Sequence, residues 1–258
     1  MDVTELRKRS FNRVAKLYDE IRPRYPDALT ADVIKLSGLR ADGRILEIGC
    51  GTGQATMPLA RKGYPMLCLE LGDKLAALAV RNCRDFPNVR ILKQTFEKWK
   101  PEPLAFNLVM SATAFHWIAP EFGYPRAAQV LKRDGSLALF WNFHPRPNND
   151  FFRGLGEIYR RHAPELASPT PFEQRIEERA RQFNASRLFQ PATVRRYPWE
   201  NRLTADQYVK AMSTQSDHII LKSAARNQLL AAIRELIVGL GGTVAIPMLS
   251  VLFIGRKR

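Results

Sequence analysis

The stretch "ILEIGCGTGQATMPLA", Ile45 to Ala60, decides the fold. Its apolar start is typical of a buried strand, and three glycines at positions 49, 51 and 53 follow at once. Glycine lets the backbone turn sharply and lets a ligand approach without a Cβ in the way. Ligands of open parallel sheets bind beyond the carboxyl ends of the strands. We therefore expect the loop after this strand to hold a ligand.

Strands and helices alternate on both sides of this stretch. Apolar runs predict strands at residues 44–49, 65–70, 89–93, 106–112 and 136–142, with helices from near Gln54, from Asp73 to Cys83 and from Tyr124 to Lys132. A helix over 221–240 precedes a Gly-Gly turn and a last strand over 243–255. Such alternation implies crossover connections and a mainly parallel sheet covered on both faces. We expect an α/β fold in a single domain, residues 1–258.

Two segments lie outside this alternation. Residues 1–30 begin with a helix whose apolar side chains, Tyr18 among them, share one face, and Pro23 and Pro26 end it. We expect this segment to be a lid. Residues 145–190 are charged and mostly helical in pattern, and we expect a helical cap inserted there.

The glycine spacing excludes the usual dinucleotide loop. The fingerprint G-x-G-x-x-G would place its third glycine at Gln54 or at Thr56. The observed pattern is E-x-G-x-G-x-G, and Glu47 inside it would repel a pyrophosphate but suit a positively charged ligand. S-adenosylmethionine has an amino group, a sulfonium and no phosphate. Glu70, about 20 residues after Gly49, ends the second strand, where its carboxylate could accept two hydrogen bonds from a ribose diol.

The motifs resemble those of a known family. "LEIGCGTGQ" followed by "LCLELG" resembles the signature of class I S-adenosylmethionine-dependent methyltransferases. "FNRVAKLYDEIRPRYP" and "FNLVMSATAFHWI" resemble the lid and fourth-strand motif of a bacterial small-molecule group, methyltransferase type 11-like and near the trans-aconitate methyltransferase-like enzymes. The resemblance covers nearly the whole chain. It implies a Rossmann-like sheet of seven strands, mainly parallel, with the last antiparallel. The glycine motif is specific for the cofactor, and none of the motifs is specific for a substrate.

The resemblance also implies the cofactor-binding residues. Those expected at the methionine and ribose portion are Glu47, Gly49, Cys50, Gly51, Gly53 and Glu70. Those expected at the adenine are Leu71, Thr95 and Phe96, although the family often has an acid where Thr95 stands. Ser111 would lie beside the methyl group, and Tyr18 of the lid could cover the sulfonium.

His116 in "AFHWI" is the candidate catalytic residue. It follows the fourth strand near the expected methyl group, and histidine is the usual base near neutral pH. The alternative is that His116 and Trp117 pack against the start of the next helix or form the wall of the pocket. Two further expectations concern residues outside this motif: His218 caps the long C-terminal helix, and Arg22 is solvated.

Charge and composition limit the partners. The net charge of +15 favours an anionic small-molecule acceptor and leaves an RNA or DNA methyltransferase as an alternative, although the basic residues are scattered and no nucleic-acid module is present. A non-catalytic protein that binds S-adenosylmethionine is a second alternative, and an NAD-dependent oxidoreductase is a third. Four scattered histidines predict no metal site. Three unpaired cysteines and a charged N-terminus predict a cytoplasmic protein without a membrane span, either a monomer or a homodimer.

Overall fold

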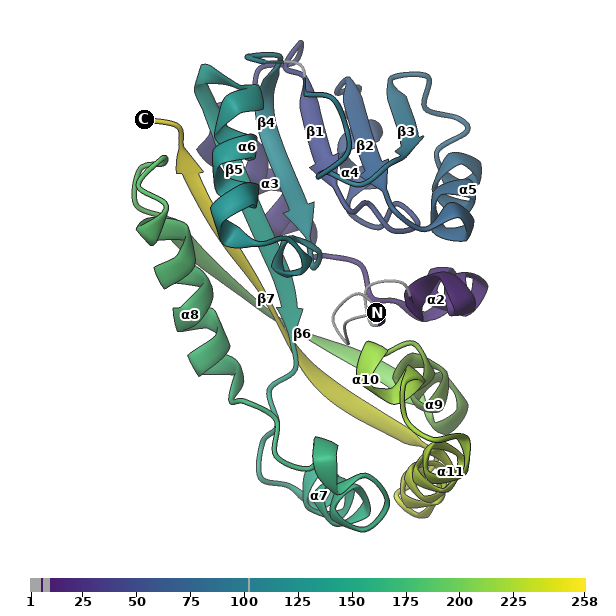
Figure 1. Ribbon diagram of the computed structural model, residues 1–258. Coiled ribbons are helices and arrows are strands. Elements are labelled where there is room, and N and C mark those ends of the chain that lie inside the picture. Colours follow the sequence, from purple (N-terminus) through teal and green to yellow (C-terminus); the bar gives the residue numbers. More distant parts are fainter. Residues whose placement is uncertain (1–5, 7–9, 102) are drawn as a thin grey trace. The chain divides into compact units, whose positions relative to one another are not determined.

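The computed structural model describes residue 6, residues 10–101 and residues 103–258 (Figure 1). The chain forms two compact units. Unit 1 takes the chain up to Pro23, His144–Phe172 and Pro198–Met248, and unit 2 takes Arg24–Phe143, Glu173–Tyr197 and Leu249–Arg258. The prediction of one domain over residues 1–258 stays a prediction.

The sheet has seven strands in the order β3-β2-β1-β4-β5-β7-β6. Their bounds are β1 Ile45–Ile48, β2 Met66–Glu70, β3 Val89–Lys93, β4 Phe106–Ala112, β5 Leu131–Phe143, β6 Thr193–Thr204 and β7 Thr243–Arg256. The pairs from β3 through to β5 are parallel, and β7 runs antiparallel to β5. The predicted Rossmann-like α/β fold with an antiparallel last strand is confirmed.

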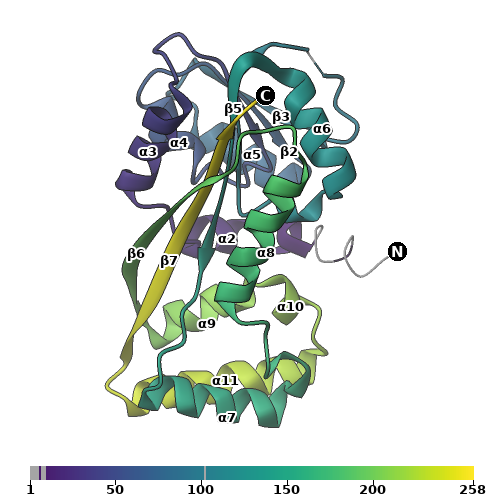
Figure 2. The same ribbon diagram turned by 90° about the vertical axis from the view of Figure 1, so that its left-hand side faces the viewer.

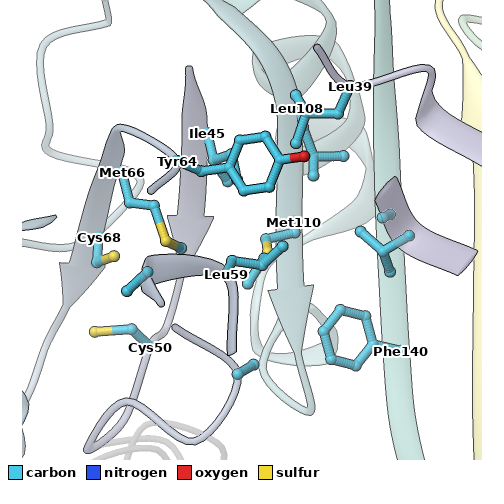
Figure 3. Close-up of a cluster of buried hydrophobic side chains, with 14 of the residues drawn as sticks. Leu39, Ile45, Cys50, Leu59, Tyr64, Met66, Cys68, Leu108, Met110 and Phe140 are labelled. Carbon is cyan, nitrogen blue, oxygen red and sulfur yellow. The ribbon is translucent and has the colours of Figure 1, made fainter. Parts of the chain in front are cut away.

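Helices cover both faces of the sheet in unit 2 (Figure 1). They are α3 Asp27–Ser37, α4 Thr56–Ala60, α5 Asp73–Asn82, η2 Phe115–Trp117, α6 Pro120–Val130 and α8 Phe172–Ala185. On one face, α3 and α4 bury a cluster with β1, β2, β4 and β5 that includes Ile45, Met66, Met110 and Phe140 (Figure 3). On the other face, Tyr124 of α6 and Phe183 of α8 meet edge to face. The third predicted helix begins a turn earlier than expected, because Pro120 occupies its first position, where a proline loses no hydrogen bond.

Unit 1 is mostly helical. It contains η1 Phe11–Val14, α2 Ala15–Ile21, α7 Asp150–His162, η3 Pro164–Leu166, α9 Ala205–Ser213, α10 Ser216–Ile219 and α11 Ser223–Gly239. Helix α7 packs along α11 (Figure 2), where Leu155 joins Leu229, Ile233 and Ile237 in one apolar cluster. A close approach is possible there because Gly154 of α7 faces Leu236, which lies 3.0 Å from where its Cβ would be.

The predicted lid and cap correspond to several elements. Residues 1–5 and 7–9 of the lid lie outside the described residues, and the rest forms η1, α2 and the start of α3. Residues 145–190 contain α7 and α8, but α7 belongs to unit 1 while nearly all of α8 belongs to unit 2. Lid and cap functions stay predictions. Within the described part of the chain, no helix has both the length and the apolar character needed to cross a bilayer.

Candidate functional site

The candidate site lies where the strand order reverses. The chain goes from β1 to β2 and β3 on one side and to β4 on the other, so the loops after β1 and β4 leave the sheet next to each other. A Cβ built on Gly49, after β1, would lie 2.5 Å from the Cβ of Ala114, after β4. The point where the strand order reverses is the usual ligand position in open α/β sheets.

The glycine loop needs its glycines for backbone reasons. Gly49, Gly51 and Gly53 have φ angles of 70°, 59° and 99°, which side-chain-bearing residues seldom adopt. Gly49 and Gly51 are half-buried, while Cys50 between them is buried. The accessible surface of the loop is therefore largely backbone, as close approach by a ligand requires.

Glu70 is held in place by two backbone amides. Gly51 donates to its Oε2 at 2.9 Å and Gly72 donates to its Oε1 at 2.8 Å. The carboxylate therefore joins the loop after β1 to the loop after β2. Each carboxylate oxygen has two lone pairs, so both can still accept hydrogen bonds from a diol.

Glu47 is fully buried beside α4. Thr56 donates to its Oε2 at 2.6 Å, and the Cys68 thiol lies 3.6 Å from the same atom. Its Oε1 has no hydrogen-bond partner among the described residues. Burial, reinforced by the negative charge of Glu70 and opposed by the two hydrogen bonds, raises the pKa of Glu47 from 4.5 to about 7.

The three cysteines are free and buried. Cys50 and Cys68 line the same apolar cluster (Figure 3). A hydrogen bond with Cys68, and then burial, raises the pKa of Cys50, while burial raises the pKa of Cys68 and of Cys83 to about 11. These thiols are therefore protonated at neutral pH and pack as apolar groups.

The three residues expected at the adenine differ in burial. Leu71, directly after Glu70, and Thr95 in the loop after β3 are half-buried. Phe96 is only 3% exposed. Its ring stacks on Trp99 and meets Phe122 edge to face, at centroid distances of 6.3 and 6.2 Å. Its contact with an adenine stays a prediction.

Ser111 and the turn after it tie β4 to its neighbours. The fully buried Ser111 hydroxyl donates to the carbonyl of Ile48 at 2.8 Å, so this hydroxyl joins β4 to β1. Thr113 has a φ of 55°, which a β-branched residue rarely adopts, and its hydroxyl lies 2.8 Å from the hydroxyl of Tyr25. Backbone strain of this kind gathers at functional sites. No sequence motif indicates this strain.

His116 is half-buried in η2 and its ring is held from one side. The indole N–H of Trp141 donates to its Nδ1 at 3.1 Å. Burial, and then the positive charges of Arg179 and Arg175, lowers the pKa of His116 to about 3. The ring is therefore neutral, and because an indole can only donate, the single proton lies on Nε2. In this tautomer Nε2 donates a hydrogen bond and has no lone pair with which to accept a proton.

Two expectations about unit 1 are wrong. His218 does not cap α11, whose N-cap is Lys222; it is 6% exposed and shares a 2.7 Å hydrogen bond between its Nε2 and the Tyr159 hydroxyl. Arg22 is not simply solvated, because it donates to the carbonyl of Thr214 at 2.6 Å. Its guanidinium also lies 4.8 Å from the ring centroid of Tyr18, so Tyr18 is already in a cation–π contact.

The residues of the loop fit S-adenosylmethionine. The unsatisfied Oε1 of Glu47 suits an ammonium group, and the fixed carboxylate of Glu70 suits a ribose diol. A side chain added at Gly49 would clash with Ala114, so the loop can keep this position only with a glycine there. A pyrophosphate would instead meet two carboxylates. Among the residues that the structure describes, no three His, Cys, Asp or Glu side chains gather closely enough to hold a metal ion.

Comparison with known proteins agrees with this geometry. Residues 45–135 match a family described as a methyltransferase domain. An uncharacterized methyltransferase of Mycobacterium tuberculosis is 26% identical over 235 residues, covering 88% of this chain and 85% of that protein. A malonyl-acyl-carrier protein O-methyltransferase of a Paenibacillus species is 27% identical over 192 residues, covering 66% and 69%.

A solved structure has the same fold at low sequence identity. Phosphoethanolamine N-methyltransferase 2 of Haemonchus contortus, solved in complex with S-adenosyl-L-methionine, has a TM-score of 0.57 and 14% identity, covering 100% of this chain and 60% of that chain.

Proposed function

We propose a small-molecule methyl acceptor for this chain, which is a class I S-adenosylmethionine-dependent methyltransferase. When bound, the cofactor supplies an electrophilic methyl group on a positively charged sulfur. The observation that carries the cofactor assignment is the Glu70 carboxylate held by the amide of Gly51 at the point where the strand order reverses.

The contacts of each residue support the following proposed cofactor roles. The Glu70 carboxylate accepts from the ribose hydroxyls, and Oε1 of Glu47 accepts from the ammonium group. The backbone of Gly49, Cys50, Gly51 and Gly53 gives the methionine portion room to lie close to the sheet. Leu71, Thr95 and Phe96 flank the adenine, and the Ser111 hydroxyl fixes β4 beside the methyl group. A role for Tyr18 in covering the sulfonium stays a prediction from the sequence.

Methyl transfer is an in-line displacement, and positioning of the two reactants supplies much of its acceleration. A base is needed only when the nucleophile must lose a proton. The tautomer of His116 suits hydrogen-bond donation to the acceptor better than proton abstraction. We therefore assign His116 to acceptor binding and orientation, a change from the general-base role that its position alone predicts.

A small acceptor is favoured over a nucleic acid. The Paenibacillus relative is named for an O-methyl transfer to a malonyl group on acyl-carrier protein. The chain reads Ser111-Ala112-Thr113-Ala114 at the end of β4 and just after it, and an N/D-P-P-Y-type motif of nucleic-acid methyltransferases is missing there. The net charge of +15 is the one observation that favours nucleic acid.

Calorimetric titration of the full chain tests the cofactor. S-adenosylmethionine and S-adenosylhomocysteine should bind and NAD should not, and Gly51→Val should abolish binding. The loaded protein is then offered small carboxylic acids, phenols and amines, with total RNA in parallel, while S-adenosylhomocysteine formation is followed. Turnover with RNA alone would overturn the small-molecule proposal, and binding of NAD alone would overturn the cofactor assignment.

A further inference from the structure

A group of side chains in unit 2 has no role in the cofactor proposal. Trp141 and Phe143 lie two residues apart on β5 and so point to the same face of the sheet. Arg179 of α8 lies over Trp141, with 5.3 Å between its guanidinium carbon and the ring centroid. Arg175, one helical turn earlier, lies 5.4 Å from the centroid of Phe143. One arginine therefore stacks on each aromatic ring.

Trp141 links these arginines to the loop after β4. Its indole N–H donates to Nδ1 of His116, whose ring also lies 4.6 Å from that of Trp117. His116 stands two residues after Ala114, the residue that touches Gly49 of the glycine loop. His116 therefore belongs to the loop region of the expected methyl group, and Trp141 connects it to Arg179 of α8.

Arg179 carries a charge that no acid in the described residues neutralises. Its Nη1 donates to Oε1 of Gln182 at 3.3 Å, and no carboxylate lies within ion-pair distance of it. Burial lowers the pKa of Arg179, and Glu178 on its own helix and Tyr124 of α6 oppose this shift. On the β5 side, its guanidinium stacks on the indole of Trp141. A guanidinium has five N–H donors and stays charged when partly buried, so an anion is the partner that this position lacks.

We propose that the methyl acceptor carries a carboxylate, which Arg179 and the Nε2–H of His116 bind beside the indole of Trp141. The inference rests on the proposed function and names its substrate class. A planar guanidinium matches a carboxylate with two parallel hydrogen bonds, and the neutral imidazole adds a donor without a second positive charge. Arg175 adds attraction for the same anion through its charge.

The test uses three probes with one skeleton: benzoate, benzamide and phenyl phosphate. Each is titrated into the full chain loaded with S-adenosylhomocysteine, and the indole ¹H–¹⁵N signal of Trp141, assigned with Trp141→Phe, reports binding at this site. Benzoate should shift this signal and bind at least tenfold more tightly than benzamide. Arg179→Gln should raise the Kd for benzoate at least tenfold, and Arg179→Lys should give an intermediate value.

Arg181→Gln is the matched control, because Arg181 is an exposed arginine of the same helix. It should leave the Kd for benzoate unchanged. Equal binding of benzoate and benzamide, tighter binding of phenyl phosphate than of benzoate, or an unchanged Kd in Arg179→Gln would each overturn the carboxylate proposal. Affinity for S-adenosylhomocysteine is measured in the same samples. Loss of S-adenosylhomocysteine binding would contradict the proposed function. In that case the comparison of benzoate with benzamide, repeated without S-adenosylhomocysteine, still tests the anion site.

Discussion

The amide of Gly51 donates a 2.9 Å hydrogen bond to Oε2 of Glu70, which joins the loop after β1 to the end of β2. The carboxylate is thereby placed before any ligand arrives. Placement of a binding group before the ligand binds reduces the entropy lost on binding.

Replacing Glu70 should mainly affect cofactor affinity. Glu70→Ala removes a charged acceptor, and hydrogen bonds to charged groups contribute about 1.5–3 kcal/mol, so affinity for S-adenosylhomocysteine should fall roughly 10- to 100-fold. Glu70→Gln keeps one acceptor oxygen and should lose less. Calorimetry measures both values. Unchanged affinity in Glu70→Ala would remove Glu70 from the ribose site.

The Gly49–Ala114 contact can be separated from backbone strain. Gly49→Ala should lower the free energy of unfolding by ~1–2 kcal/mol for its left-handed φ and by a further ~1–3 kcal/mol for the 2.5 Å clash with Ala114. Gly63→Ala is the control, because Gly63 has a φ of 85° and no atom within 4 Å of its added Cβ. Urea unfolding of both variants gives the difference. Adding Ala114→Gly to Gly49→Ala should recover only the part of the lost stability that comes from the clash. Equal losses of unfolding free energy in Gly49→Ala and Gly63→Ala would contradict the close approach of Gly49 and Ala114.

The buried Glu47 should make stability depend on pH. Below pH 4.5 the carboxyl is protonated in both the folded and the unfolded chain, so its charge has no effect. As pH rises from 4.5 to about 7 the unfolded chain releases this proton first, so stability falls, and above about 7 the loss is constant. Glu47→Gln should therefore stabilise the chain at pH 8, by up to about 3 kcal/mol, and not at pH 4. Unfolding free energies at both pH values test this, and equal gains at both would exclude titration of Glu47.

His116 should not titrate in the physiological range. With the pKa of His116 lowered to about 3, its imidazole ¹⁵N shifts should stay constant from pH 5 to 8 and show the proton on Nε2. Arg179→Gln removes a positive charge and should raise this pKa. Trp141→Phe removes the donor to Nδ1 and should populate the other tautomer. Nuclear magnetic resonance of histidine-labelled wild-type, Arg179→Gln and Trp141→Phe protein measures the pKa and the tautomer of His116. A titration midpoint near pH 6.5 in the wild-type protein would restore His116 as a candidate base.

The cysteine thiols should react slowly in the folded chain. With the pKa of Cys68 and of Cys83 near 11, about one thiol in a thousand is ionised at pH 8, and thiolate is the reactive form. Modification by a disulfide reagent should therefore follow opening of the structure. S-adenosylhomocysteine should slow it further at Cys50, which lies within the glycine loop. Mass spectrometry locates the modified residue, and fast reaction of Cys50 that the ligand does not slow would place the ligand elsewhere.

The sequence determined the sheet and the cofactor loop. Apolar runs of four to eight residues mark buried parallel strands, so β1, β2, β4 and β5 could be predicted. The spacing of Glu47, the glycines and Glu70 along the chain predicted the cofactor loop. Strands and loop could both be predicted because each depends on the local order of residues. Strand β6 was harder to predict, because its half-buried and exposed residues mix charged with apolar side chains and give no apolar run.

The tertiary structure alone decided how distant residues combine. In the sequence, His116 is recognisable only as a histidine shortly after β4. The fold brings it to Trp141, 25 residues later in the chain, and Trp141 connects it to Arg179 of α8. These contacts fix its tautomer and lower its pKa. Protonation and charge partners depend on distances in space, which the order of residues along the chain does not contain. For this reason the sequence could propose His116 as a base, and only the packed structure could favour it as a donor.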